Sequence, residues 1–71
     1  MQFAIRVSGP WDARAAELLA GVDMRIDGET RVLSADLDQA ALQGVLQRIE
    51  VLGLNLIEVR RVRAGQASKP D

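Results

Sequence analysis

The clearest pattern in the chain is a stripe of apolar residues that runs along one side of a predicted helix between Asp38 and Leu54. Apolar side chains recur there at spacings of three and four, which places them on one face of a helix with 3.6 residues per turn. The stripe consists of Leu42, Val45, Leu46, Ile49 and Leu52. Asp36 or Asp38 can cap the amino end by accepting bonds from free N–H groups. Gly53 suits the left-handed residue that ends a helix.

Gly44 stands in the middle of this helix, where glycine costs about 1 kcal/mol relative to alanine. Together with Ala40 and Arg48 it lies on a face next to the apolar stripe. The main interpretation is that another backbone approaches Gly44 closely in ordinary helix–helix packing. A ligand contact through this glycine is the weaker alternative.

Four shorter stretches alternate between apolar and polar residues, which is the period of a half-buried strand. We expect strands over residues 2–7, 22–27, 30–35 (extending at most to 37) and 55–63. A second, weaker helix is predicted over residues 11–20. Asp12 can serve as its cap or as an acidic residue of its first turn.

Two turns compete in the hairpin that joins the second and third strands. A two-residue turn that starts at Asp27 would set Ile26 opposite a glutamate and mix charge into the apolar face. A turn that starts at Gly28 pairs Met24 with Leu33, because side chains alternate with a period of two. We favour the second register.

The resulting order is strand, helix, strand, strand, helix, strand, which predicts an α+β, ferredoxin-like βαββαβ sandwich. Right-handed crossovers place both helices on one face of a four-stranded antiparallel sheet with strand order 4-1-3-2. Residues 1–63 form this single domain, and residues 64–71 are expected to be a disordered tail. The covered face of the sheet is predicted to hold Phe3, Ile5, Val7, Met24, Leu33, Ile57 and Val59.

The opposite, open face of the sheet is the first candidate for a binding surface. Its predicted contacts are Ala4, Arg6, Val32, Ser34, Leu56 and Glu58. No aromatic residue is among them, so RNA binding by base stacking is not expected. Small and aliphatic side chains mixed with charges suit a homodimer formed sheet to sheet, in which Arg6 and Glu58 pair across neighbouring strands.

Composition excludes several kinds of chemistry. The 71 residues include no cysteine and no histidine, which removes disulfides, thiolate or Ser–His nucleophiles and most zinc sites. No carboxylate pair has a reason to be held at a catalytic distance, so we expect neither an enzyme nor a cofactor. A net charge of −1 shows no footprint for nucleic acid. No apolar run is long enough to span a membrane, so a cytoplasmic protein is the default.

The loop after the first strand offers an alternative function. Ser8, Gly9 and Trp11 stand at the strand-to-helix junction that contacts ligand in amino-acid-sensing ACT domains, which share this strand order. That similarity would make the chain a regulatory domain for a small metabolite. The competing interpretation is that Trp11 is an apolar lid on the core.

Residues 38–62, DQAALQGVLQRIEVLGLNLIEVRRV, resemble a group of short, uncharacterised proteins of high-GC bacteria. The shared features are a DQAAL-x-G-x-L motif and a closing LGL-x-L-x-x-V strand. The group often has histidine at the position of Gln43, so a role that rests on that histidine is not expected here. The resemblance implies no established activity. A non-enzymatic, self-associating interaction module is therefore the first hypothesis.

Overall fold

The computed structural model describes residues 1–62; Arg63 and the predicted tail, residues 64–71, lie outside the described residues. The helices and strands follow one another in the predicted order. They are β1 (Gln2–Ser8), α1 (Ala13–Leu18), β2 (Asp23–Asp27), β3 (Thr30–Asp36), α2 (Gln39–Val51) and β4 (Asn55–Val62). The predicted α+β class is confirmed.

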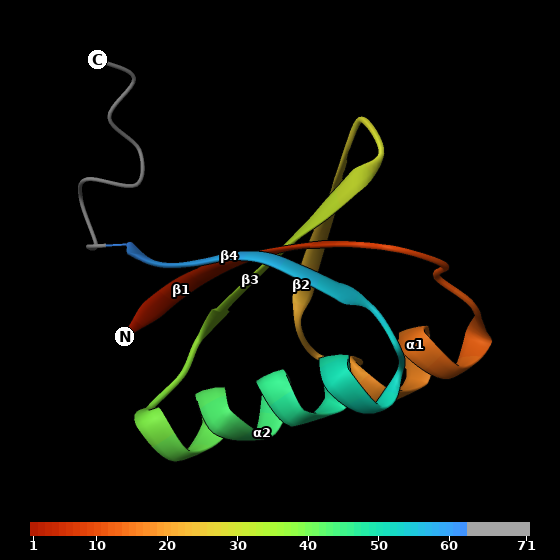
Figure 1. Cartoon of the computed structure of the whole chain (residues 1–71). Coiled ribbons are helices and arrows are strands. Elements are labelled where there is room, and N and C mark those ends of the chain that lie inside the picture. Colours follow the sequence, from red (N-terminus) through yellow and green to blue (C-terminus); the bar gives the residue numbers. More distant parts are fainter. Residues whose placement is uncertain (63–71) are drawn as a thin grey trace.

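The strands form one antiparallel sheet in the order β2-β3-β1-β4, which reads β4-β1-β3-β2 from the other edge. Both helices lie on the same side of this sheet (Figure 1). The β2–β3 hairpin turns at Gly28, because Met24 pairs with Leu33 and Asp27 pairs with Thr30. The favoured register is therefore confirmed. β1 and β3 are the inner strands, and β2 and β4 are the edges.

Helix α2 has the start and stop that its sequence predicts. Asp38 is the N-cap, since its carboxylate accepts a 2.7 Å hydrogen bond from the Ala41 N–H. Asp36, the other candidate cap, instead accepts a 2.7 Å bond from the amino group of Met1. Gly53 follows the helix with φ at +76°, the left-handed conformation that glycine adopts without strain.

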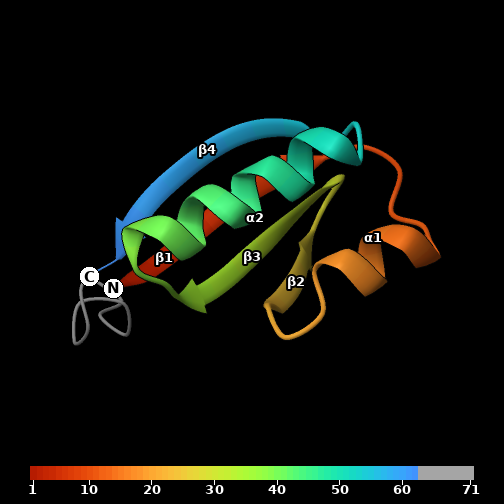
Figure 2. The same cartoon turned by 90° about the horizontal axis from the view of Figure 1, so that it is seen from below.

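Helix α1 is shorter than the predicted range of residues 11–20. Asp12 caps it by accepting a 2.9 Å bond from the Ala15 N–H, so the helix begins at Ala13 and Trp11 stays in the preceding loop. With six residues, α1 spans less than two turns. Seen from the helix side, α2 runs along the inner strands, whereas α1 lies beyond β2 (Figure 2). One long helix therefore covers the sheet.

The core lies between α2 and the inner strands. Its buried members are Ile5, Val7, Leu19, Leu33, Val45, Ile49 and Leu54. Three residues that were predicted to be covered are exposed instead: Met24 at 40%, Ile57 at 51% and Val59 at 37%. All three stand on edge strands. The short α1 leaves β2 uncovered, and α2 alone is too narrow to cover both edges.

Candidate functional site

The open face of the sheet carries mostly charged and small side chains. Ala4, Arg6 and Ser34 are half-buried, and Glu58 is exposed. The registers place two valines there: Val32 is only 8% exposed, and Val62 is half-buried. This face therefore offers little apolar area for a sheet-to-sheet contact.

Arg6, on the open face, is bonded to two residues that flank the β2–β3 turn. Its Nη1 donates a 2.7 Å bond to Thr30 Oγ1 and a 3.0 Å bond to Asp27 Oδ2. Val32 is the partner of Arg6 in the β1–β3 register, and Thr30 and Asp27 lie nearer the hairpin turn. Glu58 stands opposite Arg6 on β4, as predicted. The ion pair that Arg6 forms within the described residues is nevertheless with Asp27. Both groups are part-exposed, so this pair contributes at most about 1 kcal/mol.

Leu56 does not share the open face with these residues, which corrects the prediction. The β1–β4 register shifts between Arg6 and Val7, so that Glu58 stands opposite Arg6 but Leu56 stands opposite Val7. Ile57 is the extra residue of this irregularity. One extra residue reverses the alternation beyond it, so Leu56, which precedes Ile57, lies on the other face from the one predicted. Leu56 is accordingly at the level of buried Val7 and is 48% exposed at the sheet edge.

Strand β2 forms one edge of the sheet and is exposed along its whole length. Each of its five residues, Asp23–Asp27, is exposed. Met24 and Ile26 point to the helix side, since Met24 stands opposite buried Leu33, and they are 40% and 63% exposed. We call Asp23–Asp27 the β2 edge. An uncovered strand edge with apolar side chains is a surface on which another strand can pair.

The β4 edge is the second exposed apolar strip. Leu56, Ile57 and Val59 are 48%, 51% and 37% exposed. The register shift opposite Arg6 and Val7 interrupts the ladder in this strip. Bulges at sheet edges hinder the addition of another strand. β4 is therefore the better protected of the two edges.

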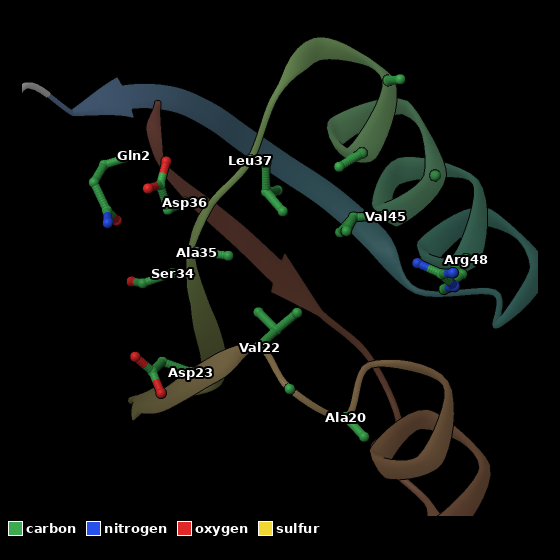
Figure 3. Close-up of a pocket in the computed structure, with 14 residues that line it drawn as sticks. Gln2, Ala20, Val22, Asp23, Ser34, Ala35, Asp36, Leu37, Val45 and Arg48 are labelled. Atoms are coloured by element: carbon green, nitrogen blue, oxygen red, sulfur yellow. The ribbon is translucent and has the colours of Figure 1, made fainter.

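A groove of roughly 550 Å³ lies between α2, the connection from α1 to β2 and the last residues of β3. Val22, Ala35 and Val45 line it with apolar surface (Figure 3). The acidic side chains Asp23 and Asp36 lie on one side of it and Arg48, on α2, lies on the other. The groove exists because six-residue α1 does not fill the space next to α2.

Gly44 faces this groove rather than another helix. A methyl group added at Gly44 would have only Arg48 Nη1 within 4 Å outside its own turn, at 3.8 Å. The predicted close helix–helix packing at Gly44 is therefore wrong for the described residues. The short α1 is the reason, since it ends before it reaches this part of α2.

Replacing Gly44 by alanine is expected to stabilise the fold by about 0.5–1 kcal/mol, because helix propensity rises and no rigid group is displaced. Urea unfolding followed by circular dichroism measures the change. Ala40→Gly on the same face is the matched opposite and should destabilise by a similar amount. A destabilised Gly44→Ala variant would show that an atom outside this monomer approaches Gly44.

The loop after β1 is held by packing. Gly9 has φ at +121°, and a methyl group there would come within 3.3 Å of Leu54 Cδ2. Trp11 is half-buried against the core, and the guanidinium carbon of Arg31 lies 5.2 Å from the centre of its ring. This cation–π contact and the core packing account for the position of Trp11. None of Ser8, Gly9 and Trp11 lines the groove.

Residues 1–62 contain no group of three acidic side chains placed to hold a metal ion. Within the same residues, neither helix has the length and apolar character needed to cross a membrane.

Comparison with known proteins identifies a family. A model described as a domain of unknown function, DUF8691, matches residues 2–60, and the chain belongs to this family. No curated protein and no solved structure matches the chain. The matched range includes the first five elements of the fold and all of β4 except its last two residues.

Proposed function

We propose that this chain is a non-enzymatic, cytosolic interaction module with a ferredoxin-like architecture that associates with itself through the β2 edge. The observation that carries the proposal is that all five residues of the edge strand β2 are exposed, including its two apolar residues on the helix side, Met24 and Ile26. Complete burial of an exposed side chain of this size contributes about 1.5–3 kcal/mol, and Met24 and Ile26 can gain the share that corresponds to their exposed 40% and 63%. In a chain of 71 residues, whose core is small, such added burial is a substantial gain.

The edge supports association better than the open face does. On the open face the central apolar residue, Val32, is already buried, with 8% of its surface exposed. Arg6 on the same face is already bonded to Asp27 and Thr30. On the β2 edge the backbone groups and the side chains of Met24 and Ile26 are available together. Strand pairing satisfies the former and buries the latter.

Replacing Ile26 by lysine is expected to abolish association, since the change places a charge in the middle of the apolar row. Sedimentation equilibrium measures the result as a loss of the dimer. Val51→Lys is the matched control, because Val51 is a β-branched residue of similar exposure, 61% against 63%, on the far side of α2. The control should associate as the unmodified chain does.

The outcome that contradicts the β2 edge is a dimer that survives Ile26→Lys and is lost in Ile57→Lys. That result would assign association to the β4 edge. Loss of the dimer in Val51→Lys alone would assign it to α2.

Binding of a small metabolite is the second candidate function, and the groove beside α2 favours it. Its volume of roughly 550 Å³ falls within the range of small-molecule sites, and Arg48 faces carboxylates across it. The site would then lie away from Ser8, Gly9 and Trp11. A native mass spectrum in which the chain retains a small adduct, removed by Gly44→Leu, would support this function over self-association alone.

A further inference from the structure

We propose that two copies join β2 to β2 antiparallel, around a two-fold axis at Met24, into one continuous eight-stranded sheet. This inference rests on the proposed self-association and specifies its partner strand and register. In such an isologous contact the same residues serve on both copies, so the edge must be complementary to itself. The charges of β2 decide whether it is.

The backbone of β2 limits the registers that can form. Asp27 and Thr30 flank a two-residue turn, which closes on a hydrogen-bonded pair. Hydrogen-bonded and non-bonded pairs alternate along an antiparallel ladder. Asp23, Arg25 and Asp27 therefore direct their N–H and C=O groups at β3, whereas Met24 and Ile26 direct theirs outward. A second strand must place its own outward residues opposite these two.

Three symmetric registers meet this condition, centred on Met24, Arg25 or Ile26. A centre at Arg25 sets Arg25 opposite itself and Asp23 opposite Asp27, and like charges directly opposite are destabilising. A centre at Ile26 sets Arg25 opposite Asp27 and Met24 opposite Gly28 of the turn. Asp27 is already bonded to Arg6 at 3.0 Å, so this register would share an engaged carboxylate.

The register centred on Met24 satisfies both faces of the new sheet. On the open face, Asp23 of each copy stands opposite Arg25 of the other, which forms two ion pairs. Within residues 1–62 neither Asp23 nor Arg25 takes part in an ion pair. On the helix side, Met24 meets Met24, and Val22 of each copy meets Ile26 of the other. Met24 and Ile26 are the exposed members of this row, at 40% and 63%. Val22, just before β2, is half-buried against the core and already donates its N–H to the Leu19 carbonyl at 3.3 Å, so its carbonyl is the group it offers to the second copy.

The β4 edge is less complementary to a second copy. Its register shifts opposite Arg6 and Val7, so the outward N–H and C=O groups are not regularly spaced there. β2 has no such shift along Asp23–Asp27. The strand is short, so the interface is small and the dimer is expected to depend on concentration.

Cysteine cross-linking tests the register, because the chain has no cysteine of its own. Two residues in a hydrogen-bonded antiparallel pair have Cα atoms about 5.5 Å apart, which suits a disulfide. Mild oxidation of the Met24→Cys variant is expected to give a covalent dimer in high yield. Ile26→Cys is the control on the same strand and should stay largely uncoupled, since the two copies of Ile26 lie about 14 Å apart in this register. Val59→Cys is the control of similar exposure on β4.

Charge exchange is the second test and leaves the apolar row intact. Asp23→Arg and Arg25→Asp should each weaken association about tenfold by placing like charges opposite one another. The double variant should restore it. Circular dichroism verifies that each variant folds.

The outcomes separate the register from association itself. Preferential coupling of Ile26→Cys, preferential coupling of Val59→Cys or failure of the charge exchange to restore binding overturns the Met24-centred pairing, while self-association stands. An unmodified chain that stays monomeric at every concentration overturns both.

Discussion

Replacing Ile49 by alanine is expected to lower the free energy of unfolding by about 3 kcal/mol. Ile49 is 2% exposed and lies on the face of α2 that meets the sheet. The loss combines the removed burial with the cavity that remains. For 71 residues the total stability is roughly 4–11 kcal/mol, so the variant loses a large part of it. Thermal unfolding should show a fall in Tm of about 15 °C.

Val51→Ala is the control on the same helix. Val51 is 61% exposed, and the change should alter stability by less than about 0.5 kcal/mol. Both variants are measured at a low concentration at which the chain is monomeric, because dimer formation adds to the apparent stability. Equal losses in the two variants would contradict the assignment of α2 as the helix that covers the sheet.

Replacing Gly9 by alanine is expected to destabilise the fold by about 2 kcal/mol. Two effects combine: the backbone at φ +121° is strained for any residue with a side chain, and the new methyl group meets Leu54 Cδ2 at 3.3 Å. Leu54 is 7% exposed and belongs to the core, so it has little room to move. Urea unfolding at low protein concentration measures the loss.

Gly21→Ala separates these two effects. Gly21 also has positive φ, at +88°, but no atom lies within 4 Å of the added methyl group. Its cost should be about 1 kcal/mol, from backbone strain alone. If Gly9→Ala cost no more than Gly21→Ala, the close approach between the β1–α1 loop and Leu54 would play no part in stability.

The features that the sequence predicts well are those set by local physics. The apolar stripe and the carboxylate of Asp38 define α2 almost to the residue, because capping and periodicity act within one helix. The β2–β3 register follows in the same way from Gly28 and from the alternation that pairs Met24 with Leu33. Both depend on residues that are close together in the chain.

The features that it does not predict depend on packing between distant elements. Met24 and Ile26 alternate as a half-buried strand should, yet they are exposed because α1 ends at Leu18 and does not cover them. The alternation shows which face is apolar but carries no information on whether a helix reaches it. Most of the apolar residues in 11–20 are alanines, whose small side chains cover little surface, and this is the signal that could have indicated a weak cover.

The candidate surface shows the same limit. Leu56 was predicted on the open face by counting alternate residues along one strand, and the shift at Arg6 and Val7 reverses that count. Val32 lies on the open face as predicted, opposite Arg6, but it is only 8% exposed, and Arg6 bonds to Asp27 and Thr30 beside the hairpin turn. Exposure at a position depends on neighbours across the sheet, which a single strand does not specify.

Native mass spectrometry of the unmodified chain over a dilution series tests the central claim most directly, because it reports stoichiometry and retained ligand together. The account predicts a species at twice the 7.7 kDa chain mass, without added mass, whose share grows with concentration. A monomer at every concentration, or an oligomer that persists only with a bound small molecule, would contradict it.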